Sequence, residues 1–151
     1  MARMKLPALA AASVDEVERA FYDAMQRGDI ERLMAVWADD DEISCVHPGA
    51  PRMIGATAIR ASYETMFAHG TIRAEPLHVR RAESHAIAVH SVIERVRIAS
   101  AEGERFAYVI ATNVWVRAAH GWRLLTHHAS PGMVDEPDAG GGDSTMTSTL
   151  H

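Results

Sequence analysis

The chain has 151 residues, of which 48% are hydrophobic and 23% charged, and its formal net charge is −5. These values are typical of one soluble globular domain, and a negative net charge gives no attraction to nucleic-acid phosphates or anionic lipids. The single cysteine, Cys45, excludes an internal disulfide, and no stretch approaches the roughly 20 apolar residues of a membrane-spanning helix. We therefore expect a cytoplasmic protein that binds neither nucleic acid nor membranes.

Composition divides the chain into three parts. Residues 1–12 are expected to form a flexible N-terminal arm, and residues 13–131 carry the apolar periodicity of a folded domain. Residues 132–151 are rich in Gly, Ser, Thr and Asp and lack this periodicity, so they are expected to form a disordered tail.

Helical spacing of apolar residues marks the first half of the domain. Ser13, with Glu16 three residues later, predicts a capping box at the start of a helix that ends at Gly28. Asp29 caps a second, shorter helix, and residues 55–70 form a third. Three N-terminal helices are therefore expected.

Extended segments lie between the second and third helices and after the third. The stretch "EISCVHP" predicts a short strand with Cys45 and His47 on one face, ended by Pro48. Beyond residue 71, three extended runs are clear and a fourth is interrupted by Pro76, which indicates an edge strand or a bulge; the clear runs are 84–100, 104–119 and 121–130. The sequence thus predicts an α+β domain whose helices pack in the concave face of a curved, mostly antiparallel sheet.

Strand alternation assigns faces in the last strand. Leu124, Thr126 and His128 share one face, opposite Arg123 and His127. Because a charged Arg123 prefers water, we expect His128 to point inward and His127 to be solvated or at a dimer seam.

The run 104–119 is apolar on both faces, with Asn113 and Trp115 on one of them. Such a strand needs cover on both sides, and helices can cover only the concave one. We therefore expect the convex face to pack against a second copy of the chain in a homodimer.

The element order, the strand ending "VHP", the helix start "GATAIR" and the final strand "GWRLLTHHAS" resemble the nuclear transport factor 2-like (NTF2-like) superfamily, within it the SnoaL-like and ketosteroid-isomerase-like proteins. The resemblance covers residues 13–131. It implies a cone-shaped α+β barrel, usually dimeric, with an apolar cavity between helices and sheet.

The resemblance also implies site positions. In ketosteroid isomerases the residue before the strand-ending proline is a carboxylate general base, and His47 holds that position here. The two oxyanion donors of those enzymes, a tyrosine and a protonated aspartic acid, correspond to Phe21 and Asn113. The Asn113 amide can donate a hydrogen bond but Phe21 cannot, and Tyr22 or Tyr63 could supply a hydroxyl from another direction.

The predicted catalytic residues are therefore His47, His128 and Asn113. One of the histidines would move a proton on a small, largely apolar carbonyl-bearing or cyclic ligand, while Asn113 orients or polarises its oxygen. The residues expected to contact the ligand are Phe21, Trp37, Tyr63, Phe67, Trp115, Thr126 and His90.

Three classes of function remain open. The first is a cofactor-independent isomerase, lyase or cyclase, and the second is a non-catalytic ligand-binding or dimeric assembly module. The third is a zinc site formed by His47, His128 and His90 with Glu94, for which no tight ligand spacing is present. No metal or cofactor is therefore expected.

Overall fold

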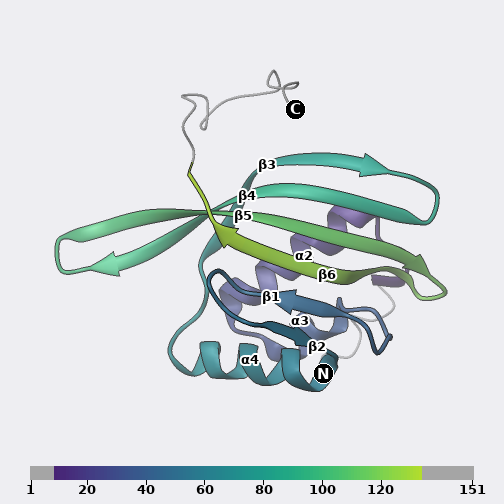
Figure 1. Ribbon diagram of the computed structural model, residues 1–151, viewed down its shortest axis with the longest axis horizontal. Helices are drawn as coiled ribbons and strands as arrows, with labels where there is room; N and C mark the ends of the chain where they lie inside the picture. Colours follow the sequence, from purple (N-terminus) through teal and green to yellow (C-terminus); the bar gives the residue numbers. More distant parts are fainter. Residues whose placement is uncertain (1–8, 134–151) are drawn as a thin grey trace.

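The computed structural model describes residues 9–133, so most of the expected tail and most of the expected arm lie outside the described residues. Three helices pack against one face of a six-stranded sheet, which curves but does not close (Figure 1). The predicted α+β architecture is confirmed.

Helix α2 (Val14–Arg27) supplies most of the helical side of the core. The Glu16 backbone N–H donates to Ser13 Oγ at 3.1 Å, and the Ser13 N–H donates to Glu16 Oε1 at 2.9 Å. The helix ends at Gly28, whose φ of 67° is the left-handed conformation that glycine adopts without strain. Both predicted ends are confirmed, and the buried stripe between them includes two polar residues, Glu18 and Tyr22.

Two further helices lie against the lower part of the sheet in Figure 1. Helix α3 (Ile30–Ala35) begins at Asp29, whose carboxylate accepts from the Arg32 N–H at 3.1 Å. Helix α4 (Ala56–Ala68) begins after Gly55 and ends at His69. In residues 9–133 no helix has both the length and the apolar character needed to cross a membrane.

The sheet has the strand order β2-β1-β6-β5-β4-β3. Its strands are β1 (Ser44–Val46), β2 (Arg52–Ile54), β3 (Ala74–Glu83), β4 (Ile87–Ser100), β5 (Gly103–Ala118) and β6 (Gly121–Pro131). Strand β1 pairs with β6 in parallel, and the other pairs are antiparallel. Strand β3 lies at the edge and shifts register between Pro76 and Val79, as Pro76 indicated; strand β2 was not foreseen.

Strand β6 contains a bulge that reverses the predicted alternation. Trp115 pairs with Leu124 and Val114 with Thr126, so Leu125 has no partner in β5. Beyond this extra residue His127 turns inward and is buried, while His128 is exposed. The expected inward orientation of His128 and Thr126 was therefore wrong.

The assumption about Arg123 was wrong as well. Its side chain is buried, and its guanidinium donates to the Trp122 carbonyl at 2.8 Å. A solvated Arg123 was the premise on which His127 was assigned to the outer face.

Candidate functional site

A buried polar network lies between α2 and the concave face of the sheet. We call it the central network: Glu18 and Tyr22 from α2, Glu94 from β4, Asn113 from β5 and His127 from β6. Each of these residues is at most 5% exposed. Buried polar groups of this kind are costly unless hydrogen-bonded, so their partners determine what the site can do.

Asn113 is the centre of the network. Its Nδ2 donates to Glu18 Oε2 at 2.9 Å and to the Tyr22 hydroxyl oxygen at 3.1 Å. Its Oδ1 therefore accepts, from His127 Nδ1 at 2.6 Å. His127 thus carries its proton on Nδ1, which leaves the Nε2 lone pair free to accept.

Glu94 accepts the hydrogen bond that the Tyr22 hydroxyl donates. The Tyr22 hydroxyl donates to Glu94 Oε2 at 2.6 Å, the only hydrogen bond of this carboxyl group among the described residues. Burial raises the pKa of Glu94 to about 7; the Tyr22 hydrogen bond acts in the opposite direction, and the charge of Glu18 adds to the rise. Glu94 can therefore gain or lose a proton near neutral pH, as a general base or acid must.

The pKa of His127 is shifted in the opposite direction to that of Glu94. Burial, with smaller contributions from the charges of His47 and His128, lowers the pKa of His127 to about 3. Its imidazole is therefore neutral near pH 7.

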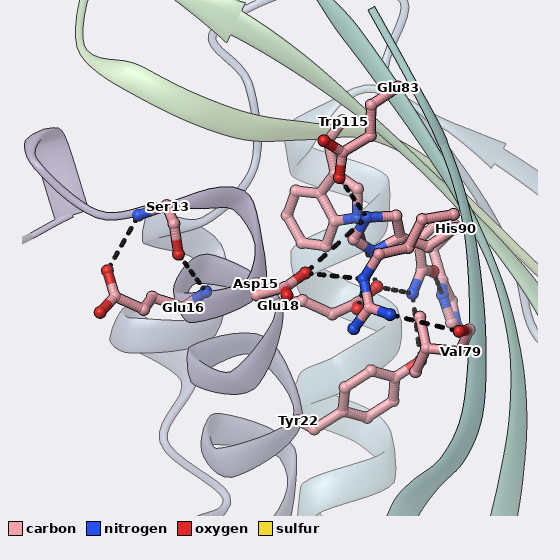
Figure 2. Close-up of polar contacts among 12 residues, drawn as sticks. Ser13, Asp15, Glu16, Glu18, Tyr22, Val79, Glu83, His90 and Trp115 are labelled. Carbon is pink, nitrogen blue, oxygen red and sulfur yellow. Dashed lines mark hydrogen bonds and ion pairs between the residues drawn. The ribbon is translucent and has the colours of Figure 1, made fainter. Parts of the chain in front are cut away.

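Glu18 joins the network to two further side chains, which Figure 2 shows beside it. Its carboxylate accepts from His90 Nδ1 at 2.8 Å and from Trp115 Nε1 at 3.3 Å, in addition to Asn113. Three donors satisfy a buried carboxylate, so Glu18 positions its neighbours.

His47 lies at the margin of the network, one residue beyond β1. Its Nε2 is 3.1 Å from Ser62 Oγ, and that hydroxyl donates to the Ile59 carbonyl at 3.0 Å. The ring contacts Tyr63 edge-on with centroids 5.0 Å apart. Burial lowers the pKa of His47, which favours the neutral imidazole.

The structure thus separates the three predicted catalytic residues. Asn113 is central, His47 is marginal, and His128 is exposed on the other side of the sheet.

Most of the expected ligand-contacting residues pack as core. Phe21 makes edge-to-face contacts with Trp37, Trp115 and His127, with ring centroids 5.2–6.4 Å apart. Tyr63 packs on half-buried Phe67. His90 is fully buried, whereas Thr126 faces outward and its hydroxyl lies 3.1 Å from Ser44 Oγ.

One surface hollow reaches an expected ligand-contacting residue. It has a volume of about 390 Å³ and lies over α3 and the start of α4. Trp37, Ile43 and Arg60 are among the residues that line it. Trp37 Nε1 is buried without a hydrogen-bond partner.

Sequence reasoning did not place Glu18 and His127 in this site, and it considered Glu94 only as a possible zinc ligand. The sequence did contain a signal for Glu18, because Glu18 and Tyr22 are four residues apart on the apolar stripe of α2. Glu94 shares the face of His90 by strand alternation. For His127 the bulge removed the signal.

Comparisons with known proteins agree with this fold. The profile of the SnoaL-like domain family matches residues 14–135. A proposed calcium/calmodulin-dependent protein kinase type II association domain from Thiobacillus denitrificans is 35% identical, with a TM-score of 0.72 over 80% of this chain and 96% of that one. A proposed dehydratase of the NTF2-like family from Streptomyces avermitilis is 30% identical, with a TM-score of 0.73 over 85% and 99%.

A third solved structure is an NTF2-like protein of unknown function from Pseudomonas putida. It is 18% identical, with a TM-score of 0.69 over 82% of this chain and 87% of that one, so this similarity supports only the shared fold. None of the curated proteins matches the sequence. The profile match over most of the chain and the two relatives at 30% identity or above establish that this chain belongs to the SnoaL-like domain family of the NTF2-like superfamily.

Proposed function

We propose that this protein binds a small, largely apolar carbonyl-bearing or cyclic molecule and acts on it as an isomerase, lyase or cyclase by acid–base chemistry without a cofactor. The SnoaL-like fold is one of small-molecule-binding and isomerase-type proteins. The observation that carries the proposal is Glu94, a buried carboxyl group with a pKa of about 7 held by the Tyr22 hydroxyl.

The proposed step is a proton shuttle. Glu94 Oε1 takes a proton from the carbon beside the carbonyl group and returns it to another carbon, so that an isomerisation leaves the enzyme unchanged. Tyr22, bonded to Oε2, stabilises the carboxylate, and Asn113 is a positioning residue that fixes Tyr22 and His127. His47 is proposed as a second proton-transfer group at the margin, while His128, exposed on the outer face, has no part in this step.

Deuterium exchange tests the proposed proton shuttle without knowledge of the natural substrate. A panel of small ketones and cyclic carbonyl compounds is incubated with the protein in D2O, and loss of the α-proton signal is followed by NMR. We expect catalysed exchange for at least one compound and a decrease of roughly 100-fold or more in Glu94→Gln, the usual contribution of a general base. His47→Gln should also slow exchange while binding stays within a few-fold.

The matched control is Glu104→Gln, which changes an exposed carboxylate of β5 in the same way. Exchange that is undiminished in Glu94→Gln would remove this carboxyl group from the mechanism. Absence of exchange over the whole panel, together with ligand binding seen by chemical-shift changes, would favour a non-catalytic pocket.

A second candidate function is that of an assembly module. It is favoured by the 35% identity to a proposed association domain and by the apolar outer face of the sheet. On that face Ile93 pairs with Ile110 and Val89 pairs with Val114. We propose a homodimer through these strands.

A further inference from the structure

A second polar cluster lies where the first turns of α2 meet the facing ends of β3 and β4 (Figure 2). We call it the His90 cluster. It consists of Asp15 and Glu18 on α2, Glu83 at the end of β3 and His90 on β4. The proton-shuttle step leaves Asp15, Glu83 and the second ring nitrogen of His90 without a role.

The hydrogen bond of His90 to Glu18 determines which ring nitrogen is free. His90 Nδ1 is 2.8 Å from Glu18 Oε1, and a carboxylate only accepts, so Nδ1 carries a proton. The opposite nitrogen, Nε2, has no hydrogen-bond partner although the side chain is 0% exposed. A buried, unpartnered nitrogen is costly in a folded protein, and a ligand would remove that cost.

The unpartnered nitrogen points at two carboxylates. His90 Nε2 lies 3.6 Å from Glu83 Oε2 and 4.0 Å from Asp15 Oδ1. These distances are too long for hydrogen bonds. They are close to the spacing of about 3.3 Å between two ligands of a tetrahedral zinc ion with bonds of about 2.0 Å, so His90 Nε2 and either carboxylate need only a small inward movement to share an ion.

The charges around this space suit a divalent cation. The carboxylates of Asp15, Glu18 and Glu83 face one guanidinium, that of Arg81, so the local charge is −2 when His90 is neutral. Burial lowers the pKa of His90, but the hydrogen bond and the charge of Glu18 outweigh it and raise the pKa, so a metal ion displaces a proton from Nε2 when it binds. Arg81 Nε donates to Asp15 Oδ1 at 3.0 Å and holds that carboxylate in place.

Glu18 also occupies the position of an outer carboxylate. In metal sites a ligating histidine commonly donates its other N–H to a carboxylate, which fixes the tautomer and strengthens the ligand. The bond from His90 Nδ1 to Glu18 has this arrangement. One possible ligand atom from each of Asp15, Glu18 and His90 lies within 4.8 Å of the others.

We propose that the His90 cluster binds a divalent metal ion of the zinc class through His90 Nε2 and the carboxylates of Asp15 and Glu83. Glu18 orients the His90 ring through its hydrogen bond with Nδ1, the nitrogen opposite the metal-binding one. The side chains of Asp15 and Glu83 are 46% and 43% exposed, so the ion enters from solvent and water completes its coordination. This ligand set differs from the histidine set weighed on the sequence alone, since His47 is engaged with Ser62 and His128 is exposed.

Zinc titration of the untagged full chain tests the site. The protein is stripped with a chelator, dialysed and titrated with zinc chloride in a calorimeter. We expect one saturable site, and a decrease in affinity of roughly tenfold or more in each of Asp15→Asn and Glu83→Gln. Both changes are at partly exposed positions, so the variants should fold, which circular dichroism checks.

Two variants control for adventitious binding. His85→Gln removes an exposed histidine from the β3–β4 turn, and Glu75→Gln removes an exposed carboxylate from β3; both should bind zinc as the wild type does. A second readout is nitrogen NMR, in which zinc should shift the His90 Nε2 resonance while Nδ1 keeps its proton.

Failure of the wild-type protein to bind zinc saturably would overturn the proposal and leave the cluster as a structural ion pair. Binding that survives in both Asp15→Asn and Glu83→Gln, or that is lost in His85→Gln, would overturn it equally, because the zinc would then be held elsewhere.

Discussion

Glu94 and His127 belong to one hydrogen-bonded network, yet burial moves their pKa values in opposite directions. The reason is common to both: burial disfavours the charged form, which is the deprotonated form of a carboxyl group and the protonated form of an imidazole. Tyr22 and Asn113, which connect them, carry no charge. At mildly acidic pH Glu94 is protonated and His127 is neutral, so neither of these two groups brings a charge into the network.

The raised pKa of Glu94 predicts a pH-dependent stability. Between pH 4.5, the ordinary pKa of the group, and about pH 7, its folded-state pKa, the folded state binds more protons than the unfolded state. The free energy of unfolding should therefore fall by about 3 kcal/mol as pH rises through this window. Glu94→Gln should lack this component. In urea denaturation from pH 4.5 to 7.5, the free energy of unfolding of the variant relative to that of the wild type should therefore increase with pH.

A control and an opposite case accompany this measurement. Glu104→Gln should differ from the wild type by a nearly constant amount over the same range. His127→Gln should give the reverse trend, because the lowered pKa of His127 makes the wild type lose stability as pH falls from 6.5 towards 3. A pH-independent difference for Glu94→Gln would contradict the raised pKa.

Residue-level prediction from sequence succeeded where alternation along a regular strand was sufficient. Asn113 and Trp115 face the interior together, and His90 does so on the neighbouring strand. The hydrogen bonds of these side chains to Glu18 could not be predicted, because they depend on how α2 is rotated and positioned against the sheet. The same holds for the pKa of Glu94, which requires its burial to be known.

At the level of elements, the bulge in β6 decides which histidine faces the site. One unpaired residue, Leu125, lets both Leu124 and His127 point inward although they are three residues apart. Bulges are known to redirect side chains next to functional sites.

Deletion of Leu125 should be tolerated. It leaves Leu124, Thr126 and His127 in regular alternation against the same partners in β5, so His127 stays inside. We expect cooperative unfolding with a loss of about 1–3 kcal/mol, measured by chemical denaturation. Deletion of Val114, the matched position in β5, should instead turn Trp115 outward and prevent folding. A folded Val114 deletion beside an unfolded Leu125 deletion would refute the assigned register.

Local signals predicted the element ends well. The capping box of Ser13 and Glu16 and the Gly28 terminus act within a few residues of themselves, and the structure has them as predicted. The three-residue strand β2 and the bulge have no such local signal. Both depend on the register of pairing with a neighbouring strand, β1 for β2 and β5 for the bulge, and the sequence does not reveal that register.

On the scale of the whole molecule, the two faces of the sheet have different surroundings. The helices cover the concave face, while the outer face of β4 and β5 keeps apolar side chains at the surface, among them Ile110 at 40% exposure. Exposed apolar surface of this kind is typical of interaction sites.

If the outer face forms the proposed dimer, Ile110→Asp should weaken self-association by roughly tenfold or more, since it would bury an unpaired charge. The matched control is Ile54→Asp, on β2 at 41% exposure, which should leave association unchanged. Sedimentation equilibrium measures both. A wild-type chain that stays monomeric at every concentration would exclude the dimer.

The parallel pairing of β1 with β6 also has a consequence for how the chain assembles. Ser44 and Thr126, whose hydroxyls meet across it, are 82 residues apart in sequence. Strands β4, β5 and β6 are joined by tight turns, so they close short loops at a small cost in chain entropy. Strand β1 gains its pairing with the meander only once β6 is in place, so the position of His47 beside the site depends on a pairing that closes a long loop of the chain.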